Sequence, residues 1–369
     1  MKNISRRTFL KSGAAAAAAA AFPLSAEAAA PAGAAAVSPL CPTQYGPVQG
    51  KEQGSHLVWY GIPYAAAPVG DARWRAPQEP AGWMDPLDCT APAPAAYQIS
   101  SAPIGTEDCL RLDVYSVPSA QSRPVLVYLH GGGNQTGSSL ALPGGDLVEN
   151  DGCVFVSLNY RLGLFGFNSL PALCPEDGDT GNFALLDIAK ALDWVRENIS
   201  AFGGDPANIT LSGFSAGGRN VMACLTSPLF AGRFQKAISF SGGITFSDPD
   251  AAARQIAAAL APLAVEDGRF ADENAAFAGL LTPDAAVREW LGSVEPSRIA
   301  SRMPHAALRM SIFPHLYADD AVLPKAGFAA GTLHEVPLLL LTGSTEFSAC
   351  ALYDGWFASE AAQNYTAAE

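Results

Sequence analysis

The stretch that decides the fold reads Ile209-Thr210-Leu211-Ser212-Gly213-Phe214-Ser215-Ala216-Gly217-Gly218. Its first four residues have the character of a buried strand, and the helical pattern Asn220 to Leu225 follows it. Between them lies G-x-S-x-G, the motif in which a sharp turn between strand and helix raises a serine above a sheet. A bare motif could be an ordinary turn, but these flanks favour the strained elbow, where glycines leave room for the backbone. We therefore expect Ser215 to be a nucleophile.

Short apolar runs alternate with helical patterns, which predicts an α/β fold with a mainly parallel sheet flanked by helices. The runs are nearly continuous in apolar residues, as expected for strands covered on both faces. They are Val125 to Leu129, Val154 to Leu158, Ile209 to Ser212, Ala237 to Phe240 and Val336 to Leu341. A helix is expected from about Phe183 to Ile199. The alanine-rich stretch from Asp248 to about Met310, broken at Pro262, Pro283 and Pro296, is interpreted as a helical cap over the sheet.

A second glycine cluster, His130-Gly131-Gly132-Gly133, directly follows the expected strand at 125–129. Backbone N–H groups of such a loop, with the N–H of the residue after the nucleophile, can converge on the oxyanion of a tetrahedral intermediate. We therefore expect Gly132, Gly133 and Ala216 to form an oxyanion hole. The cluster alone could be a flexible turn, but its position one strand–helix–strand unit before the elbow favours the catalytic interpretation.

The first residues have the composition of an export signal. The paired arginines Arg6 and Arg7 precede a run of small residues from Ala14 to Ala21 and the A-x-A site Ala26–Ala28. This order is typical of a twin-arginine signal peptide. A membrane anchor is the alternative, but it would need about 20 strongly apolar residues, and this run is mostly alanine. We assign 1–28 to the signal, 29–40 to a linker and 41–369 to one exported α/β domain, periplasmic or secreted.

Composition limits the partners of this domain. The sequence has 22 Lys and Arg against 35 Asp and Glu, a formal charge of −13, which disfavours nucleic acid and anionic membrane surfaces. No second run of spanning length follows the signal, so we expect no membrane association of the mature form. The seven cysteines have no metal-type spacing, and we expect no metal and no cofactor. Cys89 and Cys109 are the expected disulfide pair, whereas Cys153 and Cys224 lie in apolar runs and are expected in the core.

Several longer strings resemble the type B carboxylesterase family, to which para-nitrobenzyl esterases and cholinesterases belong. The strings are Gly61–Ala65, Glu107–Leu112, His130–Gly133, Asn159–Gly163, Gly181–Asp187, Phe202–Pro206 and the elbow. The resemblance implies the α/β-hydrolase fold and a triad of Ser, Glu or Asp, and His in chain order. It also implies hydrolysis of a small carboxylic ester through a serine acyl-enzyme on Ser215. Arg161 and Asp187 lie in these strings and are interpreted as a structural ion pair, with a clamp of Arg161 on a substrate carboxylate as the alternative.

The resemblance implies a triad acid after a late strand, where Glu346 is the candidate. The interval from Gly343 to Glu346 is shorter than in the family pattern, so a surface glutamate stays the alternative. The family histidine follows the acid, but no histidine follows His334 here. The histidines are His56, His130, His305, His315 and His334. Without an imidazole base a serine hydroxyl is a poor nucleophile, so we expect a C-terminally truncated domain, lacking the last strand and helix, with feeble activity.

Two departures concern the substrate. Phe214 precedes the serine where family members commonly carry glutamate, and the stretch between Gln98 and Glu107 is too short for the loop that carries the choline-binding tryptophan of cholinesterases. We therefore expect a general carboxylic ester rather than acetylcholine. A non-catalytic hydrolase-like binding protein is the alternative from another class. A lactonase or another acyl transferase would use the same machinery.

Overall fold

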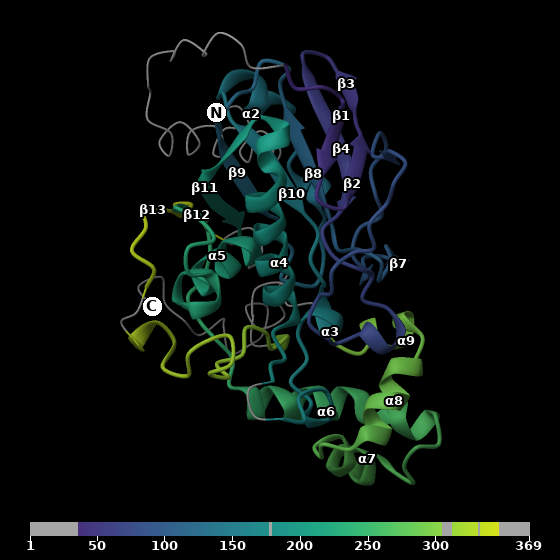
Figure 1. Cartoon of the computed structure of the whole chain (residues 1–369). Helices are drawn as coiled ribbons and strands as arrows, with labels where there is room; N and C mark the ends of the chain where they lie inside the picture. The colour runs from purple at the N-terminus through teal and green to yellow at the C-terminus, as the bar shows by residue number, and fades with distance from the viewer. Residues whose placement is uncertain (1–35, 177–178, 305–311, 331–332, 347–369) are drawn as a thin grey trace.

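An eight-stranded mixed sheet forms the centre of the fold (Figure 1). The computed structural model describes residues 36–176, 179–304, 312–330 and 333–346. The strands are β3 (Lys51–Gln53), β4 (His56–Pro63), β8 (Arg111–Ser116), β9 (Arg123–Leu129), β10 (Val154–Leu158), β11 (Gly204–Phe214), β12 (Lys236–Phe240) and β13 (Leu338–Leu341). Their order across the sheet is β13-β12-β11-β9-β10-β8-β4-β3. The strands from β13 to β10 run parallel, and β8, β4 and β3 continue antiparallel.

Helices cover both faces of this sheet. They are α2 (Gly145–Asn150), α4 (Phe183–Asn198) and α5 (Ala216–Thr226), while the short α3 (Gly163–Gly166) packs against α4. The odd positions of β9, such as Val125 and Val127, pack in one core with α4 and α5, and Leu126 and Tyr128 pack in a second core with α2. This alternation follows from the two-residue period of a strand. Apolar residues on both faces of the central strands therefore match the covered, mainly parallel sheet predicted from the sequence.

Smaller elements surround the sheet. A three-stranded sheet consists of β1 (Leu40–Thr43), β2 (Gly46–Gln49) and β5 (Leu87–Asp88), and a two-stranded one of β6 (Gln98–Ile99) and β7 (Pro103–Ile104). The 3-10 helices are η1 (Gly70–Ala72), η2 (Ser139–Ala141), η3 (Pro171–Leu173), η4 (Ile199–Phe202), η5 (Pro228–Phe230) and η7 (Gly327–Ala330). Among the described residues, no helix has the length and apolar character needed to cross a membrane.

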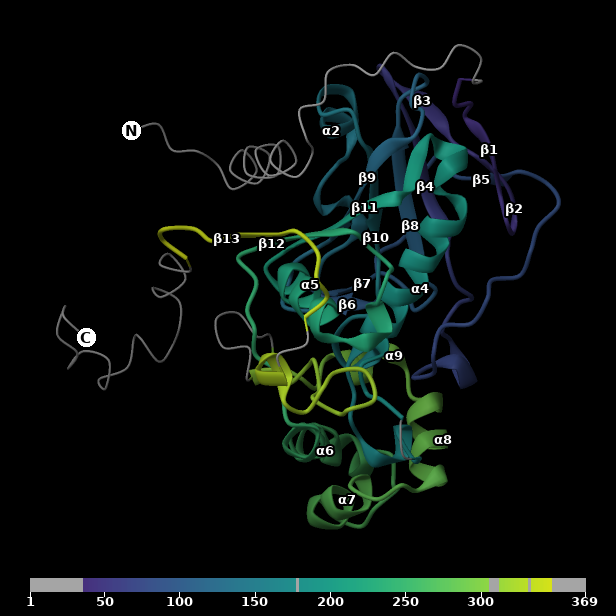
Figure 2. The ribbon, with the colours of Figure 1, turned by 60° about the vertical axis from the view of Figure 1, so that its left-hand side comes forward.

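The cap is a group of helices at the carboxyl ends of the parallel strands (Figure 2). It consists of α6 (Pro249–Glu266), α7 (Glu273–Leu280), α8 (Ala285–Ser293) and α9 (Pro296–Ala300). The helix breaks expected at Pro283 and Pro296 are present, but the break expected at Pro262 is wrong, because α6 continues through that residue. A proline inside a helix removes one hydrogen bond. Here the neighbours of Pro262, Ala261 and Leu263, are buried in the main core, and this packing offsets the loss.

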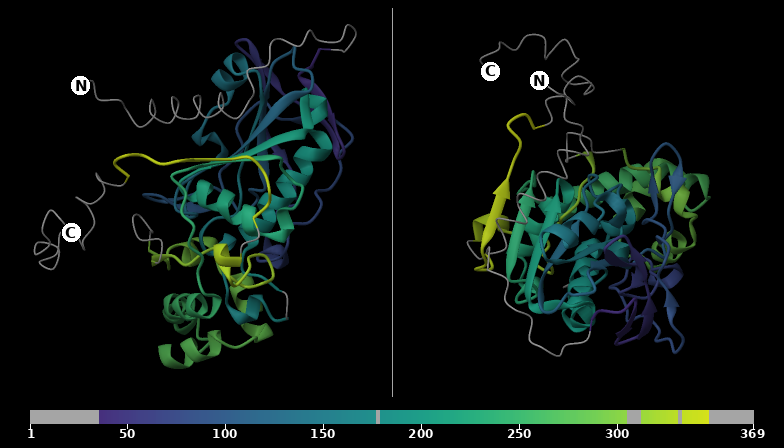
Figure 3. Two further views of the ribbon diagram at one scale, coloured as in Figure 1. Left: turned by 90° about the vertical axis from the view of Figure 1, so that its left-hand side faces the viewer. Right: turned by 90° about the horizontal axis from the view of Figure 1, so that it is seen from above.

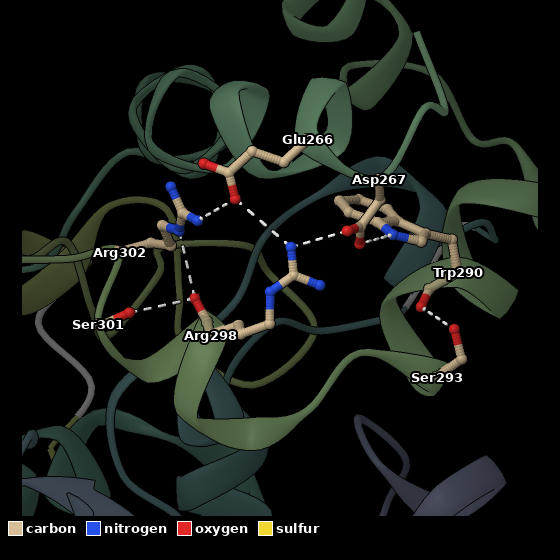
Figure 4. Close-up of polar contacts among 7 residues, drawn as sticks. All are labelled: Glu266, Asp267, Trp290, Ser293, Arg298, Ser301 and Arg302. Atoms are coloured by element: carbon tan, nitrogen blue, oxygen red, sulfur yellow. Dashed lines mark hydrogen bonds and ion pairs between the residues drawn. The ribbon is translucent and has the colours of Figure 1, made fainter.

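Ion pairs fasten the end of α6 to the following helices (Figure 4). Arg298 donates to Asp267 at 2.7 Å, and Arg302 donates to Glu266 at 2.7 Å. The indole N–H of Trp290 also donates to Asp267, at 2.8 Å. These bonds tie the end of α6 to α8, to α9 and to Arg302 just after α9, so the cap is held by polar contacts as well as by its apolar core.

The expected disulfide is wrong. Cys89 and Cys109 are both buried free thiols in the structure. Their neighbouring sequence is polar, but both side chains belong to the main hydrophobic core, where burial raises the pKa of the Cys89 thiol to about 12. Cys153 and Cys224 are buried core residues, as expected. Cys350 lies outside the described residues.

Candidate active site

Ser215 lies in a strained turn between β11 and α5. Its backbone has φ 56° and ψ −116°, a conformation that residues with a side chain rarely adopt. Neighbouring backbone groups hold it there, since the Ser215 N–H donates to the Phe240 carbonyl at 2.8 Å and its own carbonyl accepts from Arg219 N–H at 2.9 Å. The structure thus has the geometry of a nucleophile elbow at the carboxyl edge of the sheet.

The glycines of the elbow allow α5 to approach the sheet closely. A Cβ atom on Gly217 would lie 2.0 Å from the carbonyl oxygen of Leu129, at the end of β9. A Cβ atom on Gly213 would lie 2.4 Å from the backbone of Gly217. Both clashes are with backbone atoms that cannot move away independently, so these two positions require glycine.

The glycine loop after β9 lies against the same turn. Gly132 and Gly133 have φ values of 115° and 66°, in the region that favours glycine. A Cβ atom on Gly131 would lie 3.2 Å from Cβ of Ser215, so the loop and the serine are in direct contact. Within the described chain, the N–H groups of Gly132, Gly133 and Ala216 make no hydrogen bond. Unpaired donors beside a serine are what an oxyanion site needs.

Two asparagines that the sequence analysis did not identify connect this loop to α5. Asn134 and Asn220 are fully buried, and each side-chain amide donates to the other's oxygen, at 3.0 and 2.9 Å. Asn134 also has a positive φ of 57°. The pair joins residues 86 positions apart, so no local pattern could have revealed it.

None of the described histidines is bonded to Ser215. His130 is buried with Nδ1 2.9 Å from the Gly131 carbonyl and its ring stacked on Tyr160, and burial lowers its pKa to about 4. His56, His315 and His334 have other partners, namely Glu149, the Phe313 carbonyl and the Ser227 carbonyl. His305 lies outside the described residues.

Strand β13 is at the edge of the sheet (Figure 3), and Glu346 follows it in the sequence. It is exposed, and its Oε1 accepts from the Gly343 N–H at 2.6 Å, from Thr342 Oγ1 at 3.1 Å and from the Ser241 hydroxyl. The Gly343 N–H first, and then the Ser241 hydroxyl, lower the pKa of Glu346. The side chain is therefore held in its ionised form next to the loop that follows β12.

Arg161 and Asp187 form the expected ion pair. The Arg161 Nη2 and Nε donate to Asp187 Oδ1 and Oδ2 at 2.7 and 2.8 Å, and both residues are buried. Burial alone would lower the pKa of Arg161, but Asp187 raises it. Because both oxygens of Asp187 face this guanidinium, the pair fits a structural role rather than a substrate clamp. Within the described part of the chain, no group of three His, Cys, Asp or Glu side chains could hold a metal ion.

The fold and the elbow define the protein as an α/β-hydrolase. The model of the Carboxylesterase family matches residues 37–353, so the chain belongs to the type B carboxylesterase family. A twin-arginine translocation signal matches residues 3–23, which identifies the chain as exported by that pathway.

Named relatives agree with this family. The para-nitrobenzyl esterase of Bacillus subtilis (strain 168) is 37% identical over 318 residues, 82% of this chain and 62% of the relative. The fumonisin B1 esterase of Sphingopyxis macrogoltabida is 39% identical over 60% of this chain and 44% of the relative. A solved para-nitrobenzyl esterase structure has a TM-score of 0.71 at 36% identity, over 85% of this chain and 65% of that one. The chain thus spans less than two thirds of the length of these relatives.

Proposed function

We propose that this chain acts on small carboxylic esters by acyl transfer through Ser215, with Gly132, Gly133 and Ala216 as oxyanion donors. The observation that carries the proposal is the strained Ser215 turn beside three N–H groups that have no partner among the described residues. Membership of the carboxylesterase family supports the same chemistry.

The proposed reaction has two steps. Ser215 Oγ attacks the ester carbonyl carbon, and the carbonyl oxygen, now negatively charged, accepts hydrogen bonds from the three N–H groups. The C–O bond to the alcohol breaks, the alcohol leaves with a proton, and water then hydrolyses the acyl-serine to a carboxylic acid. The Oγ proton needs an acceptor, and we propose Glu346 as the acid that orients such a base. No histidine of the described residues contacts Glu346.

A second candidate is a hydrolase-like binding protein, in which the site holds an ester without cleaving it. It is favoured by one observation, namely that Ser215 has no histidine partner among the described residues. Either protein would work outside the cytoplasm, and we propose a periplasmic or secreted product cleaved near Ala28. For partners, we propose a small-molecule ester and neither nucleic acid nor membrane, given the formal charge of −13.

Release of 4-nitrophenolate from 4-nitrophenyl acetate separates the two candidates. The full chain is compared with Ser215→Ala and with the control Ser200→Ala, an exposed serine in η4. The hydrolase proposal expects a slow turnover that exceeds the Ser215→Ala rate and is kept in the control. Ser215→Ala sets the baseline, because binding and the oxyanion hole alone retain about 10³- to 10⁴-fold acceleration over water in a site that lacks a triad member. Equal rates for all three proteins would instead favour the binding protein.

A further inference from the structure

Arg219 is a partly buried cation one helical turn after the candidate nucleophile. It lies in the first turns of α5, and its N–H donates to the Ser215 carbonyl at 2.9 Å. Nothing in the proposed chemistry so far uses its guanidinium. This helical hydrogen bond fixes the Arg219 backbone relative to Ser215.

The Arg219 guanidinium lies against the loop that follows β12. Nη1 donates to the Thr245 carbonyl at 3.2 Å and to Thr245 Oγ1 at 2.5 Å, and a Cβ atom on Gly243 would lie 2.5 Å from Nη2. Since β11 and β12 run parallel, this loop and the Ser215 turn are at the same edge of the sheet. In open α/β sheets that edge is where ligands bind.

No acid neutralises this charge within the described residues. Burial lowers the pKa of Arg219, and no carboxylate acts against it. The buried Arg161, by contrast, is paired with Asp187, and Arg298 of the cap is paired with Asp267. Removing a cation from water without a counter-charge costs free energy. The charge also reaches a neighbour, since burial first, and Arg219 to a lesser extent, lower the pKa of His315 to about 4.

The hydrogen bonds leave part of the guanidinium available. Both bonds of the side chain come from Nη1, so Nε and Nη2 have no hydrogen-bond acceptor in the described structure. These two nitrogens form the fork that binds a carboxylate with two parallel hydrogen bonds. Ile244, which lies in this loop between Gly243 and Thr245, is 58% exposed and adds apolar surface beside the charge.

We propose that Arg219 is a specificity-determining residue that binds a second, ionised carboxylate carried by the ester substrate. The substrate class is then an ester with a free carboxylate, such as a half-ester of a dicarboxylic acid or an acyl ester of a hydroxybenzoate. The formal charge of −13 repels such anions in general, so a local cation is needed to hold one. The inference rests on the proposed function, because it places the ligand beside Ser215.

The test is calorimetric titration of the full chain carrying Ser215→Ala, so that probes bind without being cleaved. Each of two matched pairs of probes compares a carboxylate with its methyl ester, so that its members differ in charge and in one methyl group: 4-acetoxybenzoate with its methyl ester, and monomethyl adipate with dimethyl adipate. The pairs carry the carboxylate on the alcohol side and on the acyl side, respectively. We expect tighter binding of the anion in at least one pair, and a roughly 10- to 100-fold fall in the anion-to-neutral affinity ratio when Arg219→Gln is added.

Two further variants separate the effect of the position of the Arg219 guanidinium from the effect of the overall charge of the protein. Gly243→Ala keeps the charge but displaces the guanidinium, so we expect the ratio to fall in the same pair of probes. Arg196→Gln removes an equal charge near the end of α4, which precedes the start of β11 and thus lies at the opposite edge of the sheet. The ratio is expected to stay unchanged in that control.

The outcomes distinguish this inference from the proposed function. An affinity ratio that Arg219→Gln leaves unchanged, or no measurable binding of either anion, overturns the inference. If 4-nitrophenyl acetate is nevertheless hydrolysed in a Ser215-dependent way, the proposed function survives that result. If the ratio falls as expected but no Ser215-dependent hydrolysis is found, the carboxylate site stands and the hydrolase proposal fails.

Discussion

The two strands that precede the candidate nucleophile and the candidate acid differ in how the fold holds them. Strand β11 lies between β9 and β12, and its Leu211 is fully buried. Strand β13 pairs only with β12 within the described sheet, and its Leu340 is 60% exposed. Ser215 is therefore held by neighbouring backbone on several sides, whereas Glu346 is held by three hydrogen bonds, two from the Ser241 and Thr342 hydroxyls and one from the Gly343 N–H.

The difference shows that packing around the turn, together with the glycines of the elbow, fixes the position of the nucleophile. A strained backbone persists only where the surrounding structure over-determines it. The centre of the sheet meets that condition, because Gly217, Leu129 and Phe240 surround the Ser215 turn. The edge strand β13 does not meet that condition. Substitutions in the central strand β11 and in β13 should therefore differ in their effect on stability.

The largest effect is expected for the buried ion pair that supports the centre. Asp187→Ala leaves Arg161 as an unpaired buried charge and should lower the free energy of unfolding by roughly 3–5 kcal/mol. The control is Asp108→Ala, because Asp108 pairs with Arg111 but its side chain is 46% exposed, and less than about 1 kcal/mol is expected there. Urea unfolding measures both, and equal losses would contradict the comparison.

The leucines of the two strands provide a direct contrast. Leu211→Ala creates a cavity in the core and should cost about 2–5 kcal/mol of unfolding free energy. Leu340→Ala on the exposed face of β13 should change it by roughly 0.5 kcal/mol or less. Urea unfolding tests this, because a shift of the denaturation midpoint at an unchanged m-value measures the change in unfolding free energy. A large loss at Leu340 would mean that the edge is packed as tightly as the centre.

Lowering the pH should reduce the free energy of unfolding through protonation of His130. The pKa of His130 is about 4 in the folded protein because of burial, against an ordinary value of 6.5. A lowered histidine pKa contributes stability that is present above pH 6.5 and is lost as pH falls towards 4, by roughly 3 kcal/mol in total. His315 titrates over the same range, so His130→Gln should remove about half of the histidine-dependent slope. An unchanged slope in urea unfolding between pH 6.5 and 4 would refute the buried, neutral His130.

A smaller effect is expected for the asparagine pair. Asn134→Ala leaves the buried amide of Asn220 without its partner and should cost about 1–3 kcal/mol. The double variant with Asn220→Ala should cost less than the sum of the single variants, because the pair is lost only once. Strict additivity would show that the two amides do not interact.

The sequence predicted the centre of the fold well and its edges less well. Strand β10 has the predicted bounds because it is a continuous apolar run, and α4 begins at the predicted Phe183 because its apolar residues recur at helical spacing. Strand β13 begins at Leu338 rather than Val336, since Pro337 has no N–H to donate to a neighbour. Long-range packing could not be predicted from one sequence. Long-range packing determines that the thiols of Cys89 and Cys109 are buried, that α6 continues through Pro262, that Asn134 and Asn220 pair, and that Arg219 has no acidic partner among the described residues.

The most direct test of the account is to label the nucleophile covalently. Diethyl 4-nitrophenyl phosphate in excess should slowly phosphorylate Ser215 Oγ with release of 4-nitrophenolate, because the strained turn presents this hydroxyl beside unpaired N–H donors. The rate is expected to be low, because no histidine of the described residues takes the Oγ proton. Intact mass and peptide mapping are expected to find one diethylphosphoryl group on the Ser215 peptide of the full chain and none on Ser215→Ala. An unlabelled protein, or an adduct on another residue that persists in Ser215→Ala, would contradict the claim that the fold displays Ser215 as a nucleophile.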